Sequence, residues 1–71
     1  MSAYPLENPK VFSRLVWQAR KNWGYSQREL AHMAGVSQKF ISEFESGKET
    51  VQLKQALMVC SALNLRILIE I

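Results

Sequence analysis

Three neighbouring polar side chains, those of Gln38, Lys39 and Ser42, have the chemistry needed to contact the edges of DNA bases. A lysine ammonium can donate to guanine O6 and N7, a glutamine amide can bind adenine bidentately, and a serine hydroxyl suits several bases. Glu43 is the discordant neighbour, because a carboxylate repels phosphate, although it could accept from a cytosine amino group. Taken alone, a pair such as Gln38 and Lys39 is more typical of a solvated helix face than of a DNA contact, so the elements around them decide the interpretation.

The segment that holds these side chains has the pattern of a short amphipathic helix. Ser37 is a good N-cap, and Gly47 is the residue that ends the helix. Residues three and four apart are neighbours on a helix, so the apolar side chains share one face. These side chains are Phe40, Ile41 and Phe44. The pattern predicts a helix whose apolar face packs while its polar patch points away.

A second short helix is predicted immediately before it. Ser26 is a strong N-cap, and Glu29 three residues later completes a capping box. Gly35 then supplies the left-handed conformation that ends a helix. The apolar stripe between them consists of Leu30, Ala31 and Ala34. Its two small alanines allow a close approach by the next helix, so the two helices are predicted to form one tightly turned unit.

This unit resembles the Xre/Cro-type helix-turn-helix of phage repressors and bacterial regulators. The match is carried by residues 26–31 (SQRELA), 35–38 (GVSQ) and 44–48 (FESGK), and the resemblance covers residues 10–64. It implies a lambda-repressor-like domain that binds double-stranded DNA.

The resemblance also implies roles for individual side chains. The implied base contacts are Gln38, Lys39 and Ser42. The implied phosphate contacts are Gln27, Ser37, Lys48 and Arg20. In the family, an arginine at the place of Arg20 pairs with a glutamate at the place of Glu45, so these two are also expected to form a structural pair.

The N-terminal part is predicted to be an arm, residues 1–8, followed by a longer helix. Asn8 and Pro9 form a good helix start, and Gly24 ends the helix. The helix stripe consists of Phe12, Leu15, Val16, Ala19 and Trp23. Trp17 lies off that stripe, and we interpret it as partly buried beneath the arm rather than as a protein contact.

A further helix is predicted after Lys48, with Thr50 as the nearest good cap and its end near Asn64. Its stripe consists of Leu53, Ala56, Leu57, Cys60 and Leu63. Because Cys60 lies within the stripe, we interpret it as a small buried hydrophobe rather than a reactive thiol.

The last seven residues, 65–71 (LRILIEI), are rich in β-branched side chains and predict a strand. The side chains predicted on one face are Leu65, Ile67, Ile69 and Ile71. Since no second strand is predicted, pairing with the same strand of another copy would satisfy the backbone and form a two-fold homodimer. Two recognition helices would then lie roughly 34 Å apart, and the operator would be palindromic.

The predicted fold is therefore mainly α. It is a four-to-five-helix domain over residues 9–64, after the arm of residues 1–8 and before a dimerisation strand of residues 65–71. This order resembles the HipB antitoxin family. Membership would imply a repressor of its own operon that binds a HipA-type serine/threonine kinase toxin. The open alternatives are a stand-alone phage-type regulator and an interaction module that neutralises a kinase, with DNA binding secondary.

Composition is consistent with this interpretation but does not decide it. Nine Lys and Arg against six Asp and Glu give a net charge of +3, which suits a nucleic-acid partner. The 71 residues allow one domain, and the single cysteine suits a reducing cytoplasm. No membrane span, signal peptide, metal site, cofactor or catalytic group is expected, because the sequence contains none of their patterns. No aromatic-bearing sheet is predicted, which disfavours a single-stranded RNA binder.

Overall fold

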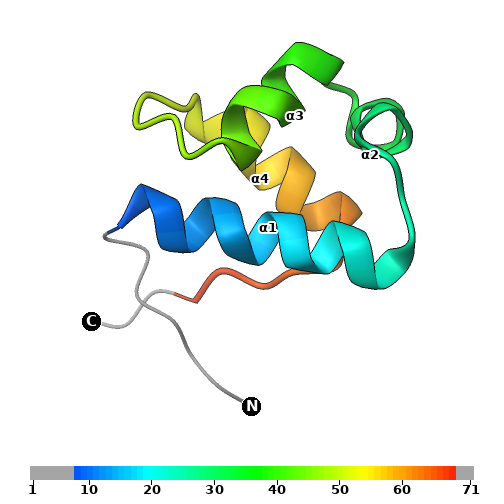
Figure 1. Cartoon of the computed structure of the whole chain (residues 1–71), viewed down its shortest axis with the longest axis horizontal. Helices are drawn as coiled ribbons and strands as arrows, with labels where there is room; N and C mark the ends of the chain where they lie inside the picture. Colours follow the sequence, from blue (N-terminus) through cyan, green and yellow to red (C-terminus); the bar gives the residue numbers. More distant parts are fainter. Residues whose placement is uncertain (1–7, 69–71) are drawn as a thin grey trace.

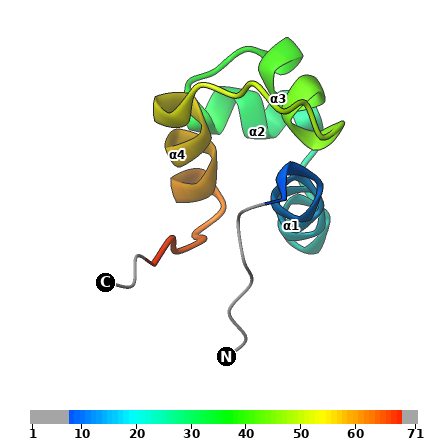
Figure 2. The same ribbon diagram turned by 90° about the vertical axis from the view of Figure 1, so that its left-hand side faces the viewer.

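The computed structural model describes residues 8–68, and within that range the chain forms four helices. They are α1 (Pro9–Trp23), α2 (Gln27–Ala34), α3 (Gln38–Glu45) and α4 (Leu53–Ala62). Figure 2 shows α2 and α3 across the top of the molecule, with α4 descending on the left and α1 lower on the right, and Figure 1 shows α1 running beneath the other helices. The mainly helical prediction is confirmed, while the arm, apart from Asn8, lies outside the described residues.

Helix α1 begins and ends at the residues that the sequence predicts. The Asn8 side chain accepts a hydrogen bond from the Lys10 amide at 2.9 Å, and Gly24 ends the helix with φ of 78°. Only glycine adopts that left-handed conformation readily, so the chain can turn sharply into α2.

The expected burial of Trp23 in the stripe of α1 is wrong. Trp23 is more than half exposed, and it is the last residue of α1. Its indole N–H donates to the Leu63 carbonyl at 3.1 Å, and its ring stacks on Tyr25. Trp17 is also exposed, with the Lys21 ammonium 5.8 Å from its ring centre, and the arm predicted to cover it is outside the described range.

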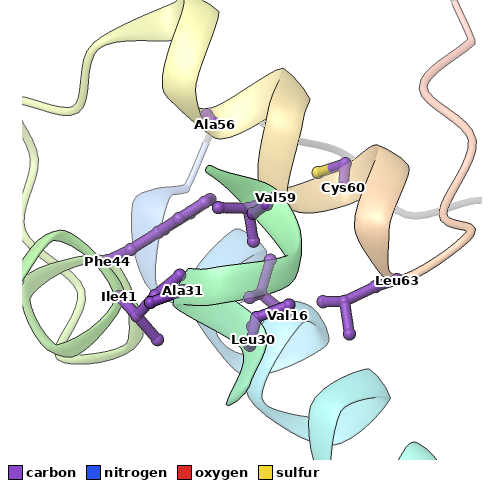
Figure 3. Close-up of a cluster of buried hydrophobic side chains, with 10 residues drawn as sticks. Val16, Leu30, Ala31, Ile41, Phe44, Ala56, Val59, Cys60 and Leu63 are labelled. Carbon is purple, nitrogen blue, oxygen red and sulfur yellow. The ribbon is translucent and has the colours of Figure 1, made fainter. Parts of the chain in front are cut away.

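One hydrophobic core joins all four helices (Figure 3). Its buried members are Val16, Leu30, Ala31, Ala34, Ile41, Phe44, Ala56, Val59, Cys60 and Leu63. Phe44 also packs edge-on against Phe12 of α1, with ring centres 5.0 Å apart. The core therefore fixes the inner face of α3 against both α1 and α2.

The predicted stripe of α4 is wrong at two positions. Leu53 is 70% exposed and Leu57 is also exposed, whereas Val59 is fully buried. The helix is rotated so that Val59 and Leu63, four residues apart, point into the core, and this rotation turns both leucines outward. The N-cap is Gln52 rather than Thr50, and its side chain makes no capping hydrogen bond.

Cys60 is buried in the core, which confirms its interpretation as a packing residue. Burial raises the pKa of its thiol to about 11, because a desolvated thiolate is unfavourable. The thiol therefore stays protonated and unreactive at neutral pH.

The predicted strand is not formed in the part of it that the structure describes, residues 65–68. A strand needs a neighbour for its backbone, and a single copy provides none here. Leu65 and Ile67 instead pack on the chain's own core, while Arg66 and Leu68 are exposed. Ile69 and Ile71 lie outside the described residues. Figure 2 shows this segment leaving α4 on the side away from α3.

Candidate nucleic-acid interface

The turn between α2 and α3 is fixed by hydrogen bonds of its backbone. Gly35 has φ of 76°, and the amides of Gly35 and Val36 both donate to the Ala31 carbonyl at 3.0 Å. The Ser37 hydroxyl then accepts from the Phe40 amide, also at 3.0 Å, and starts α3. The predicted terminus of α2 and cap of α3 are thus confirmed, and together they fix the direction of α3.

The start of α2 forms the predicted capping box. The Ser26 hydroxyl accepts from the Glu29 amide at 3.0 Å, and the Glu29 carboxylate accepts from the Ser26 amide at 2.9 Å. The hydrogen bond from the Ser26 amide, and after it the Ser26 side chain, lowers the pKa of the Glu29 carboxyl, because it stabilises the ionised carboxylate. The N-termini of α2 and α3 are therefore each capped by the serine that precedes the helix.

The outer face of α3 presents the three predicted base-contacting residues together. Gln38, Lys39 and Ser42 are all exposed, and the Lys39 side chain is 86% exposed. Ile41 and Phe44 are buried on the opposite side of the helix. A rigid helix thus holds an amide, an ammonium and a hydroxyl on one free surface, the set that suits base edges in a major groove.

A buried ion pair between Arg20 of α1 and Glu45 of α3 joins these two helices. The Arg20 guanidinium donates to both carboxylate oxygens of Glu45, at 2.6 Å from Nε and 2.9 Å from Nη2, and the side chains are only 7% and 4% exposed. Its Nη1 donates to the Tyr25 carbonyl at 2.8 Å. Because the guanidinium is buried and bonded on three nitrogens, Arg20 forms the expected structural pair with Glu45, while its contact with phosphate stays a prediction.

Gln27 links this pair to the surface. Its Nε2 donates to Glu45 Oε1 at 3.2 Å, which leaves the second N–H of the amide free of that bond. The side chain is half-buried at the first residue of α2. Glu45 therefore fixes the orientation of a residue that is predicted to contact phosphate.

Comparison with known proteins agrees with this geometry. The chain matches the helix-turn-helix family over residues 18–68. It is also 37% identical over 59 residues to an uncharacterized HTH-type transcriptional regulator, y4mF, from Sinorhizobium fredii, covering 83% of this chain and 78% of that protein. The chain belongs to the Xre/Cro helix-turn-helix family of DNA-binding transcriptional regulators. Members of this family are not enzymes.

Solved structures similar to this regulator include two of HipB. A HipB–O2 20mer complex superimposes with a TM-score of 0.85 at 25% identity, covering 96% of this chain and 94% of that one. A HipA–HipB–O2–O3 complex gives a TM-score of 0.81 at 25% identity, covering 97% and 93%. Over the residues that the structure describes, the regulator therefore has a four-helix fold similar to that of HipB.

The loop after α3 adds residues that the sequence interpretation missed. A hollow of about 310 Å³ lies beside α3, and its wall includes both Lys39 and Lys48. Its other polar lining residues are Ser37, Glu43, Thr50, Gln52 and Gln55. Thr50 is predicted only as a helix cap, and Gln52 and Gln55 have no signal in the sequence beyond polarity, because only the folded loop and the first turn of α4 place these residues beside α3.

Between residues 8 and 68, no three His, Cys, Asp or Glu side chains form a group that could hold a metal ion. None of the four described helices is long and apolar enough to cross a membrane. Within the same residues, every buried side-chain nitrogen and oxygen has a hydrogen-bond partner.

Proposed function

We propose that the chain is a sequence-specific repressor that inserts α3 into the major groove of DNA. The observation that carries this proposal is the exposure of Gln38, Lys39 and Ser42 on one face of a helix whose other face is buried. In this arrangement the three side chains contact base edges, which specify sequence. Phosphates on either side are contacted by Gln27, Ser37 and Lys48. Ser37 can cap α3 and still donate its hydroxyl proton to a phosphate.

The repressor acts as a homodimer on a palindromic operator. The segment from Leu65 onward is the proposed dimerisation strand, because its apolar residues alternate and its described residues, 65–68, form no strand with the rest of the described chain. It leaves α4 on the side away from α3, so pairing there keeps both recognition helices free. Two helices one DNA turn apart, roughly 34 Å, would contact two half-sites of opposite orientation.

The finer proposal is that this repressor is the antitoxin of a HipA-like kinase module. It is supported by the likeness to HipB at 25% identity and by the presence of HipA with HipB in one of the similar structures. On this proposal the chain binds the kinase, represses the operon that encodes both proteins and works in the cytoplasm. A stand-alone regulator is the alternative, since the y4mF relative is described only as a transcriptional regulator.

The DNA-binding proposal is tested by selecting bound duplexes from a randomised library and measuring their affinity. We expect an inverted repeat to be enriched, and Gln38→Ala to weaken its binding by about 1–3 kcal/mol. Arg14→Ala, on the exposed surface of α1, is the control for general effects of substitution. Failure to enrich any sequence, or unchanged affinity for Gln38→Ala, would contradict the proposal.

The antitoxin proposal is tested separately, by co-expressing the chain with the product of the neighbouring gene. We expect a kinase that co-purifies with the chain and loses activity in the complex. A neighbouring gene that encodes no kinase, together with intact operator binding, would favour the stand-alone regulator.

A further inference from the structure

Glu43 lies between two lysines that are assigned different tasks on DNA. Its Oε2 is 2.8 Å from Nζ of Lys48, the proposed phosphate contact, and its Oε1 is 4.0 Å from Nζ of Lys39, the proposed base contact. The Glu43 side chain is 37% exposed. The negative charge therefore belongs to the surface that faces DNA, where a carboxylate is otherwise unfavourable.

The backbone after α3 creates this arrangement. The Glu43 carbonyl accepts from the Ser46 hydroxyl at 2.7 Å and from the Lys48 amide at 3.3 Å. Between them Gly47 has φ of 88°, which reverses the chain and returns Lys48 to the side of Glu43. The contact of the carboxylate with Lys48 is thus set by the turn, and this ammonium holds the pKa of the Glu43 carboxyl below its usual value.

The position of Glu43 affects binding differently for a duplex that has a hydrogen-bond donor opposite Glu43 and for a duplex that has none. Exposed ion pairs contribute little to stability, so Lys48 can exchange Glu43 for a phosphate. The carboxylate then remains near the phosphates and reduces the favourable potential of both lysines. A cytosine amino group in the major groove can donate to it and offset that cost, but a duplex without a donor at that position cannot.

We propose that Glu43 is a specificity-determining residue that weakens binding to non-operator DNA more than binding to the operator. This inference rests on the proposed function, because it requires α3 to face the major groove. The penalty acts on every duplex, while the compensating hydrogen bond is available only where an amino group stands opposite Glu43. Glu43 thereby increases the ratio of the affinity for the operator to the affinity for non-operator DNA.

The test compares Glu43→Gln with the unaltered chain on two duplexes across a salt series. One duplex is the sequence selected from the random library, and the other is its scrambled version. We expect Glu43→Gln to bind the scrambled duplex about five- to tenfold more tightly, with a salt slope steeper by about 0.9, the value for one further phosphate. Affinity for the selected duplex should change less than about twofold or fall.

Glu49→Gln is the matched control, because it removes the same charge from an exposed residue in the same loop. We expect it to leave the ratio of the two affinities unchanged. The inference is overturned if Glu43→Gln shifts both affinities equally or leaves both unchanged, or if Glu49→Gln alters the ratio as much. If the unaltered chain binds no duplex at all, the proposed function fails as well.

Discussion

The Arg20 side chain connects three parts of the molecule through a single guanidinium. It joins α1 to Glu45 at the end of α3 and to the Tyr25 carbonyl before α2. Through Glu45 it also orients Gln27, the proposed phosphate contact at the start of α2. A charge this deeply buried needs every one of these partners, because desolvation would otherwise make it strongly unfavourable.

Removing one member of this pair should therefore be costly. Arg20→Ala leaves the Glu45 carboxylate buried without its counter-ion, and we expect the free energy of unfolding to fall by about 3–5 kcal/mol. Urea denaturation followed by circular dichroism measures this loss. The double variant Arg20→Met, Glu45→Met should recover much of it, since no uncompensated charge remains. A loss below about 1 kcal/mol for Arg20→Ala would show that the pair is not a structural one.

At the scale of elements, α2 depends on the charge of its capping box. The pKa of Glu29 is lowered in the folded chain, so its ionised form stabilises folding above about pH 4.5, and this contribution disappears as the pH falls through the lowered pKa. Glu29→Gln keeps a hydrogen-bonding side chain but removes the charge. We expect it to be less stable than the unaltered chain at pH 7 and equally stable in strong acid, as measured by thermal unfolding at each pH. A difference in stability between Glu29→Gln and the unaltered chain that grows as the pH falls would contradict this prediction.

Helix α4 lacks the cap that the other three helices have. Gln52 precedes its first turn with an extended backbone but makes no side-chain hydrogen bond there. Gln52→Ser places a hydroxyl where it can accept from the free amides, and we expect a gain of about 0.5–1 kcal/mol in stability. Gln52→Ala is the control that changes the side chain without supplying an acceptor. Equal midpoints in urea for the two variants would contradict the prediction.

The sequence predicts α1, α2 and α3 well because their ends are encoded locally. Asn8, Ser26 and Ser37 each make the cap expected of them, and Gly24 and Gly35 each adopt the left-handed conformation that ends a helix. The start of α4 was misplaced at Thr50, since no residue there makes a capping bond. Periodicity also could not decide which side of α4 is buried, because apolar residues lie all around it and only packing against α2 selects Val59 over Leu57.

The candidate site likewise contains some features that could be predicted from the sequence and others that could not. That Lys39 and Ser42 share the exposed face of α3 follows from helix geometry and could be predicted. The contact between Glu43 and Lys48 could not, because it depends on the reversal of the chain at Gly47. Long-range packing and turn geometry, rather than local preference, thus account for what the sequence missed.

At the scale of the whole molecule, the proposed dimer depends on the residues from Leu65 onward. Truncation before Leu65 removes the proposed strand, and we expect light scattering to change from a dimer to a monomer with much poorer operator affinity. Leu65 and Ile67 also cover the chain's own core, so stability should fall, and circular dichroism must show that the helices persist. A truncated chain that is folded and still dimeric would contradict strand pairing.

A base-by-base affinity profile of the selected half-site tests most directly whether α3 reads DNA sequence. Each base pair is replaced in turn, and binding is measured for the unaltered chain, Lys39→Ala and Lys48→Ala. We expect Lys39→Ala to lose about 1–3 kcal/mol on the selected sequence and to lose discrimination at one base pair. Lys48→Ala should weaken every duplex about equally, because phosphate contacts carry no sequence information. A Lys39→Ala profile with discrimination unchanged at every base pair would contradict sequence reading by α3.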